Sequence, residues 1–223
     1  MTGRQAKDAL YAQFSRLGKA VSNPRRIELL ELLAQTERSV EELASLSGMD
    51  FANTSAQLQV LGRARLVEGR RHGKRVIYGL ADQDVVGFLA SLRELSRARL
   101  AEVEQVARDY FHARDHLEPI SSEELIKRLG DGQSLVIDVR PAQEYATGHI
   151  SGALSVPLAE LEARIPELSR DLEIVAYCRG PYCVLAPQAT EILRRAGLTA
   201  RRLEDGFPEW RLAGLPVEVG ASS

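Results

Sequence analysis

The chain has 223 residues, of which 44% are hydrophobic and 27% charged, and its formal net charge is −2. This length exceeds the usual single-domain size of roughly 100 to 150 residues, and the ordinary composition excludes disordered, collagen-like and membrane-embedded classes. The first residues contain no apolar run of the signal-peptide type, and two cysteines separated by four residues do not form a secreted disulfide framework. We therefore expect two domains in a cytoplasmic protein that does not associate with membranes.

The charge is unevenly distributed along the chain. Residues 1–118 contain 18 Lys and Arg against 16 Asp and Glu, whereas residues 119–223 contain 11 against 15. Residues 63–75 alone contain six basic side chains and one acidic side chain. A local basic patch of this kind is typical of proteins that bind nucleic acid.

The first third of the sequence predicts several helices. Apolar residues recur at intervals of three and four over residues 5–21, which predicts an amphipathic helix. Asn23 and Pro24 are typical of the N-cap and first position of a second helix. Residues 39–46 predict a third helix, which begins with capping-box spacing and ends at Gly48.

A polar helix and a basic hairpin follow. Residues 52–63 predict a helix with an apolar inward face and no acidic side chain. Residues 66–68 and 76–80 predict strands on either side of a basic hairpin, in which Gly73 supplies the positive φ of a tight turn. A short helix, a polar helix and a basic hairpin in this order indicate a winged helix-turn-helix domain.

Residues 82–117 predict one long helix whose apolar stripe needs a partner helix. Pro119 ends it, because proline disfavours the helical conformation in the residue before it. We place the domain boundary there, with the first domain at residues 1–118 and the second at residues 119–223.

The second domain alternates between predicted helices and short buried strands. The helices are expected at 123–129, 158–165 and 184–196, and the strands at 135–138, 174–177 and 200–203. This alternation indicates a parallel sheet covered on both faces. The expected fold is thus a mainly α winged helix-turn-helix domain followed by an α/β domain.

The first domain resembles the ArsR/SmtB family of winged-helix repressors over about residues 5–110. Residues 23–33 are similar to the family's second helix, residues 53–61 to its recognition helix, and residues 66–78 to its wing. The resemblance implies a DNA-binding transcriptional repressor that forms a homodimer through the first and last helices of this domain. Its twofold symmetry implies a palindromic operator in double-stranded DNA.

On this resemblance, the polar helix enters the major groove and the wing neutralises phosphates. The expected DNA-binding residues are Asn53, Thr54, Ser55, Gln57, Gln59, Arg70, Arg71, Lys74 and Arg75. Two alternatives stay open: the basic hairpin is only a solvated surface, or the winged domain serves protein contacts.

Many members of this family sense metal ions. The predicted third helix has no cysteine, so one of the family's metal sites is missing here. Asp109, His112, Asp115 and His116 have helical spacing and could in principle bind zinc, but a solvated helix end is the favoured interpretation. We assign no metal and no cofactor.

The second domain resembles the rhodanese family over about residues 119–217. The residues that carry the resemblance are 136–140, 144–145, 148–153, 175–179 and 206–217. The resemblance implies a sulfur-handling loop around Cys178, placed between a strand and the start of a helix. Inward-facing amides and the helix dipole are expected to hold Cys178 as a thiolate, with a pKa below the free value of about 8.5.

Such a thiolate can take sulfane sulfur from a donor, store it as a persulfide and pass it to a thiol acceptor. Arg179 adds positive charge beside it. Asp138 and Arg140 are expected near the loop, where Arg140 orients the loop or a substrate anion, or where the two form an internal ion pair. His149 and Trp210 are interpreted as structural residues.

The loop departs from the commonest rhodanese pattern in three ways. Gly180 comes early, Pro181 removes one amide donor, and Cys183 stands where the family often has arginine. Cys183 either resolves a Cys178 persulfide into a disulfide or polysulfide bridge, or it is a buried small hydrophobic residue. These departures count against efficient sulfur transfer to a small acceptor.

The sequence therefore predicts a regulator in which reactive sulfur or an oxidant modifies Cys178 and shifts the dimer between DNA-binding and DNA-releasing forms. One alternative is a working sulfurtransferase with an attached DNA-binding domain. Another is a metal-responsive repressor with an inert rhodanese-like domain.

Overall fold

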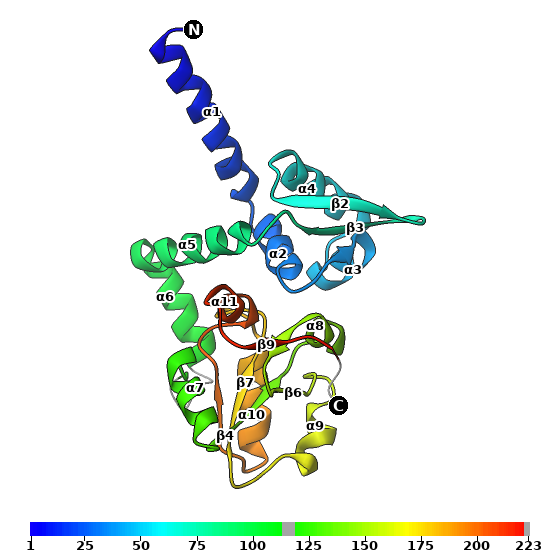
Figure 1. Cartoon of the computed structure of the whole chain (residues 1–223), viewed down its shortest axis with the longest axis vertical. Helices are drawn as coiled ribbons and strands as arrows, with labels where there is room; N and C mark the ends of the chain where they lie inside the picture. The colour runs from blue at the N-terminus through cyan, green and yellow to red at the C-terminus, as the bar shows by residue number, and fades with distance from the viewer. Residues whose placement is uncertain (113–118, 221–223) are drawn as a thin grey trace. The chain divides into compact units, whose positions relative to one another are not determined.

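A computed structural model describes residues 1–112 and 119–220, which divide into two compact units, Met1–Leu89 and Ala90–Ser223. Figure 1 shows the elements of both units. Within the described residues, no helix combines the length and the apolar character needed to cross a bilayer.

The first unit is a winged helix-turn-helix fold, as predicted. Its helices pack beside an antiparallel sheet of strand order β1-β3-β2. The elements are α1 (Gly3–Val21), α2 (Pro24–Leu33), β1 (Arg38–Ser39), α3 (Val40–Ser47), α4 (Phe51–Arg63), β2 (Val67–His72) and β3 (Arg75–Leu80).

The predicted helix ends are confirmed by their capping contacts. The Asn23 side chain accepts hydrogen bonds from the first backbone amides of α2, so it satisfies donors that have no partner within the helix. Ser39 and Glu42 form a reciprocal capping box at the start of α3. Gly48 ends α3 in the left-handed conformation with φ 66°, which favours glycine.

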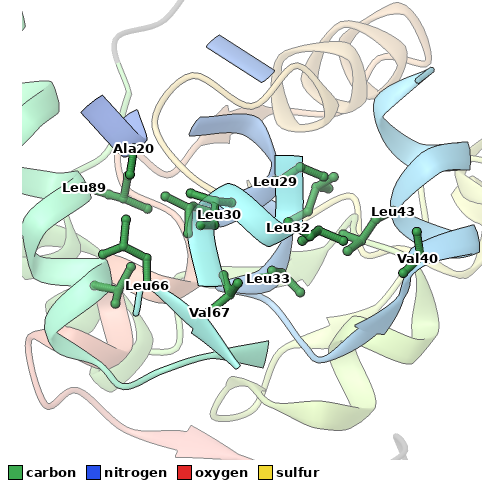
Figure 2. Close-up of a cluster of buried hydrophobic side chains, with 13 residues drawn as sticks. Ala20, Leu29, Leu30, Leu32, Leu33, Val40, Leu43, Leu66, Val67 and Leu89 are labelled. Atoms are coloured by element: carbon green, nitrogen blue, oxygen red, sulfur yellow. The ribbon is translucent and has the colours of Figure 1, made fainter. Parts of the chain in front are cut away.

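Leucines of α2 form the centre of the core of the first unit. Leu29 and Leu30 are fully buried against Leu43 of α3 and Val67 of β2. Leu89, from the helix that follows β3, belongs to the same cluster (Figure 2). This core fixes the position of α4 and of the hairpin that follows it.

The hairpin is longer than the sequence predicted. β2 and β3 pair as far as His72 and Arg75, so only Gly73 and Lys74 form the turn. Gly73 has the expected positive φ of 62°. A two-residue turn with glycine first matches the right-handed twist of the flanking strands.

The prediction of one continuous helix over residues 82–117 is wrong. α5 (Asp84–Arg99) stops before Leu100, whose backbone is extended with φ −114° and ψ 103°, and α6 (Ala101–Ala107) follows. The π-helical segment η1 (Arg108–His112) then continues. The sequence carries a sign of the break, because Leu95 and Leu100 are five residues apart and so leave the helical stripe. The rest of the predicted helix lies outside the described residues.

The second unit contains the predicted α/β domain. Its parallel sheet has the order β6-β4-β7-β8, and β5 pairs with β9 separately. The strands are β4 (Ser134–Asp138), β5 (His149–Ile150), β6 (Leu154–Ser155), β7 (Glu173–Tyr177), β8 (Ala200–Arg202) and β9 (Val217–Glu218). The helices are α7 (Ser122–Gly130), α8 (Ala142–Thr147), α9 (Leu161–Arg164), the 3-10 turn η2 (Ile165–Glu167), α10 (Leu185–Arg195) and α11 (Phe207–Leu212).

Both faces of this sheet are buried, as predicted. Along β7, Ile174 and Ala176 point into a core shared with α9 and α10. Val175 and Tyr177 point into the opposite core, shared with α7 and α11. This alternation follows from the period of two in a β-strand. It also decides which face each residue of the candidate site occupies.

The division into compact units falls before the boundary that the sequence predicted. Residues 90–112 belong to the second unit, although they precede residue 119. The boundary after residue 118, which assigns residues 90–118 to the winged domain, therefore stays a prediction.

Candidate functional site: a cysteine pair and a nucleic-acid interface

The cysteine loop leaves β7 and returns to the start of α10, as predicted. Cys178 directly follows Tyr177 and therefore points to the opposite face, into the core beneath α10. It is only 3% exposed, whereas Cys183 at the far end of the loop is partly exposed. Both cysteines are free thiols.

The Cys178 thiol is held as a neutral donor. Its sulfur lies 3.9 Å from the carbonyl oxygen of Gly180 and 3.7 Å from that of Cys183. Burial, together with the neighbouring Cys183 thiol, raises the pKa of Cys178 well above its ordinary value, and amides of Ala186 and Gly180 do not offset this. The prediction of a lowered pKa for Cys178 is therefore wrong, because it counted the amides and omitted the cost of burying the charge.

Cys183 shows the behaviour that was expected of Cys178. A hydrogen bond from the Cys178 thiol lowers the pKa of Cys183 to about 7, and backbone amides of Leu185 and Arg179 act in the same direction. Burial acts against them but is outweighed. The Cys178 thiol and the amides of Leu185 and Arg179 thus stabilise negative charge at the end of the loop.

α11 holds the other side of the loop in place. The backbone amide of Phe207 donates to the Cys178 carbonyl over 3.0 Å. A Cβ atom on Gly206 would lie 2.2 Å from the Gly180 nitrogen and 2.5 Å from the Arg179 carbonyl carbon. The loop and the start of α11 therefore touch backbone to backbone, which only glycine allows.

Arg179 is held by a buried carboxylate of α8. Its guanidinium group donates to both oxygens of Glu144, with Nη2 at 2.6 Å from Oε1. Glu144 is fully buried, so this ion pair fixes the direction of the Arg179 side chain. Nothing in the sequence patterns marked Glu144 as the partner, because the pair joins residues 35 positions apart.

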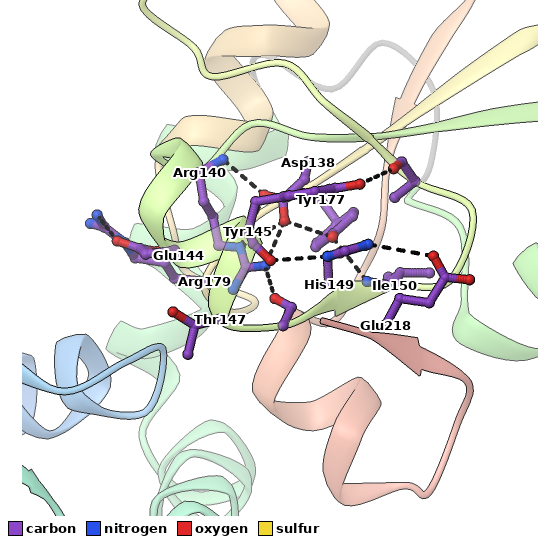
Figure 3. Close-up of polar contacts among 12 residues, drawn as sticks. Asp138, Arg140, Glu144, Tyr145, Thr147, His149, Ile150, Tyr177, Arg179 and Glu218 are labelled. Carbon is purple, nitrogen blue, oxygen red and sulfur yellow. Dashed lines mark hydrogen bonds and ion pairs between the residues drawn. The ribbon is translucent and has the colours of Figure 1, made fainter. Parts of the chain in front are cut away.

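Asp138 and Arg140 form the internal ion pair that the sequence left open as an alternative. Both are fully buried, and Arg140 Nη2 lies 2.5 Å from Asp138 Oδ2 and 2.8 Å from the Gly148 carbonyl oxygen. The Tyr177 hydroxyl donates to the same aspartate over 2.6 Å (Figure 3). Since Tyr177 and Cys178 point to opposite faces, this cluster lies across the sheet from the cysteine sulfur. The geometry favours a structural role over a catalytic one.

His149 and Trp210 occupy structural positions, in line with the prediction. The His149 ring stacks on Tyr145 with centroids 3.6 Å apart, and its Nδ1 lies 2.9 Å from the Tyr145 carbonyl oxygen. Trp210 is 2% exposed, and its indole donates to the Pro216 carbonyl.

The polar helix predicted to read DNA is α4. Asn53 and Gln59 are exposed, and Ser55 and Gln57 are half-buried. Thr54 corrects the prediction, because it is fully buried and its hydroxyl donates to the Asp50 carbonyl over 2.8 Å. Thr54 therefore belongs to the core rather than to a DNA-facing surface.

Two contacts fix the polar side chains of α4. Gln57 donates to Asn53 Oδ1 over 3.0 Å and accepts from Arg26 Nη1 over 2.8 Å. Arg26, which the sequence did not single out, thus reaches the polar side chains of α4 from α2. Asp50 caps the helix by accepting from the Asn53 amide.

The predicted wing residues are all exposed, but they differ in charge balance. Arg71, Lys74 and Arg75 lie at or beside the turn of the hairpin. Arg70 instead forms an ion pair with Glu37, which partly neutralises it. The free positive charge therefore concentrates at the tip of the hairpin.

The possible zinc ligands of the last helix are only partly visible. Asp109 lies in η1, whereas Asp115, His116 and the side chain of His112 lie outside the described residues. Among the residues that are described, no group of three or more His, Cys, Asp and Glu side chains is arranged to hold a metal ion.

Together, the fold and the cysteine loop define a winged helix-turn-helix protein with a rhodanese-like domain. The rhodanese-like domain family matches residues 121–213, and the HVO_A0114 family matches residues 21–83. The chain is 47% identical to the HTH-type transcriptional regulator Rv0324 of Mycobacterium tuberculosis, over 96% of this chain and 94% of that protein. The chain belongs to this family of ArsR-type HTH transcriptional regulators with a C-terminal rhodanese-like domain.

Other relatives match one half of the chain each. A sulfurtransferase of Allochromatium vinosum is 34% identical over 44% of this chain and 92% of its own length. A homodimeric winged helix-turn-helix DNA-binding domain from Mycobacterium bovis, a possible ArsR-family regulator, is 42% identical. The match covers 45% of this chain and 91% of that one, with a TM-score of 0.41.

Proposed function

We propose that this protein is a dimeric, cytoplasmic transcriptional repressor that binds a palindromic operator and releases it when reactive sulfur modifies the cysteine pair. One observation carries the proposal: two free thiols interact at the start of α10, in a chain that also has a polar recognition helix and a basic wing. A persulfide or polysulfide is the donor class that such a pair accepts.

Exposed polar groups support the DNA-binding half. Asn53 and Gln59 of α4 present amide groups of the kind that pair with adenine in the major groove. Arg71, Lys74 and Arg75 at the hairpin tip provide charge for phosphate contacts. The relative Rv0324, named as a transcriptional regulator over the same length, supports the same role.

An uncovered apolar face supports dimer formation. Leu10, Phe14 and Leu17 of α1 recur at four and three residues and are 57%, 62% and 40% exposed. A contiguous apolar face of this kind is typical of a protein interface. A second copy of the chain is the proposed occupant, since the family resemblance places α1 in a symmetric interface.

The cysteine loop also contacts a helical segment that precedes it in the chain. The Tyr182 ring, inside the loop, lies 6.0 Å from the Phe111 ring of η1. Glu209 of α11 accepts from the Gly206 amide and pairs with Arg93 of α5. Both contacts lie within the second unit and provide a physical route from the loop to α5 and η1.

Operator binding tests the proposal directly. We would select a duplex from a random-sequence library and measure its affinity for wild type, Cys178→Ser and Cys183→Ser before and after treatment with polysulfide. We expect treatment to weaken wild-type binding at least about tenfold, or 1.4 kcal/mol, and to leave both variants unchanged. Equal affinity of treated and untreated wild type would remove the sensing claim.

A sulfurtransferase is the second candidate, favoured by the rhodanese-like sequence of residues 121–213. Turnover of thiosulfate with cyanide, lost in Cys178→Ser, would support it. Turnover at the background rate would leave the transcriptional regulator as the only candidate function.

A further inference from the structure

The polar side chains of α4 are contacted by a cation from the neighbouring helix α2, the guanidinium group of Arg26. We propose that Arg26 is a positioning residue for base reading. It sets the direction of the Gln57 amide, which in turn sets the direction of the Asn53 amide that meets the DNA. This assignment deepens the proposed operator binding and rests on it for its ligand, the major groove of double-stranded DNA.

Contacts with the end of α1 hold the Arg26 guanidinium group in one place. Its Nε donates to the carbonyl oxygen of Ala20, and its Nη2 donates to that of Lys19 over 2.9 Å. Both carbonyl groups belong to the last turn of α1, where regular helical hydrogen bonds end and the helix dipole favours a cation. The remaining nitrogen, Nη1, lies 2.8 Å from Gln57 Oε1.

The chemistry of the guanidinium group fixes the polarity of the contacts that follow. Arginine has N–H donors and no acceptor, so the atom of Gln57 that faces Arg26 must be the amide oxygen. The Gln57 amide nitrogen therefore faces Asn53, and it donates to Asn53 Oδ1 over 3.0 Å. Since Gln57 engages that oxygen, Asn53 presents its Nδ2 amino group to a ligand. The cation on α2 is thus relayed through two amides as an N–H donor on α4.

Asn53 is the end of this relay that a base can reach. It is exposed in the first turn of α4, whereas Gln57 and Arg26 are partly buried. Reading adenine would require the Asn53 oxygen as well as its nitrogen, and the oxygen already accepts from Gln57. Guanine offers two acceptors in the major groove, N7 and O6, whereas cytosine offers only an amino donor. The polarity of the relay therefore predicts guanine opposite Asn53.

Operator duplexes selected by the full-length wild-type protein give the first measurement. Affinities for the selected duplex and for its single-base-pair variants are compared between wild type and Asn53→Ala. The base pair whose preference disappears in Asn53→Ala is the one that Asn53 reads. We expect guanine there, and at least about tenfold weaker binding when the pair is reversed to place cytosine at that position. A preference for cytosine, or no preference lost in Asn53→Ala, would overturn the assignment.

Arg26→Met removes the guanidinium donors, so that the Gln57 amide can rotate. We expect the preference for guanine over cytosine to fall below about threefold, while the slope of log affinity against log salt concentration stays as in wild type. An intact preference with weaker binding would make Arg26 only a phosphate contact or a cap of α1. Arg25→Met is the matched control, since Arg25 pairs with Glu28 within α2, and it should keep the preference.

Gln57→Glu tests the relay without changing Arg26. A carboxylate can accept from Arg26, but it cannot donate to Asn53, so the Asn53 amide should rotate and present its oxygen. We expect the preferred base to change from guanine to cytosine, whose amino group suits an acceptor. The added charge weakens binding to both duplexes, so the ratio of the two affinities is the quantity compared. A retained preference for guanine would contradict the relay.

Circular dichroism checks that each variant is folded. All of these measurements use protein that has not been treated with polysulfide. A failed sulfur response would therefore leave the role of Arg26 standing, and a failed relay would leave the sulfur response standing.

Discussion

The pKa values of the two thiols in the cysteine loop are shifted in opposite directions. The pKa of Cys183, about 7, lies below the ordinary thiol value of about 8.5. Its ionisation therefore stabilises the fold above pH 8.5, and this contribution is lost as the pH falls to 7. The raised pKa of Cys178 has the opposite sign, because the fold favours the neutral thiol and loses that contribution as the pH rises above 8.5.

Asp138 connects two buried side chains of the second unit, Arg140 and Tyr177. Asp138 accepts from Arg140 and from the Tyr177 hydroxyl, and burial together with the Asp138 carboxylate raises the pKa of Tyr177 well above its ordinary value. Tyr177 thus stays protonated as a donor, and its oxygen accepts from the Ile150 amide.

We expect Asp138→Asn to lower the free energy of unfolding by about 3 kcal/mol, because it leaves a buried guanidinium group without its counter-charge. Urea unfolding followed by Trp210 fluorescence measures the change in the second unit. Asp171→Asn is the matched control, since Asp171 is exposed, and it should change the free energy by less than about 0.5 kcal/mol. Equal stability of both variants would contradict the structural role of the pair.

At the scale of elements, the cysteine loop is shaped by its contact with the start of α11. We expect Gly206→Ala to destabilise the second unit by about 3 kcal/mol, because the added Cβ meets backbone atoms of the loop that cannot rotate away. Gly130→Ala in α7 is the control, since a Cβ there meets no atom within 4 Å. If the two substitutions had the same effect in urea unfolding, the close approach would not constrain the loop.

The hairpin of β2 and β3 carries exposed positive charge, and one of its basic residues, Arg70, is paired with Glu37. We expect Lys74→Ala to reduce the slope of log affinity against log salt concentration by about 0.9, the value of one phosphate contact. Arg70→Ala should reduce it less, because Glu37 already offsets the Arg70 charge. Binding to the selected operator over a salt series measures both slopes, and a larger loss for Arg70→Ala would move the phosphate contact away from the hairpin tip.

The contact between the Tyr182 and Phe111 rings links the loop to η1. If it transmits the state of the cysteines, Tyr182→Ala should keep cysteine modification but abolish the tenfold effect of polysulfide on operator affinity. Tyr182→Phe keeps the ring and should behave like wild type. Mass spectrometry of the loop peptides and DNA binding on the same samples separate transmission from reactivity. A full polysulfide response in Tyr182→Ala would exclude this route.

At the scale of the whole molecule, the exposed apolar face of α1 is the dimer interface that we propose. We expect Phe14→Asp to convert the dimer to a monomer in light scattering and to weaken operator binding, because it places a charge in the interface. Ala12→Asp adds the same charge about 160° away around the helix from Phe14 and should leave the dimer intact. A dimer in both variants would mean that α1 is not the interface.

The sequence by itself determined the order of elements and the two fold classes. Helix caps at Asn23 and Ser39, the glycine turn at Gly73 and the alternating helices and strands all depend on residues close together in the chain. Local hydrogen bonds and periodicity decide such features, so they can be recognised without the fold. The motif around Cys178 likewise located the loop that holds the two cysteines.

Only the tertiary structure decided which groups meet at that site. Cys178 and Thr54 are buried only in the folded chain. The ion pair of Arg179 with Glu144 and the contact of Gly206 with the loop join segments far apart in the sequence. Burial sets the cost of a charge, and the hydrogen bond from Cys178 to Cys183 sets where that charge is stabilised. The sequence could name both cysteines, but their acidity depends on solvent exposure and on neighbours that the fold alone brings together.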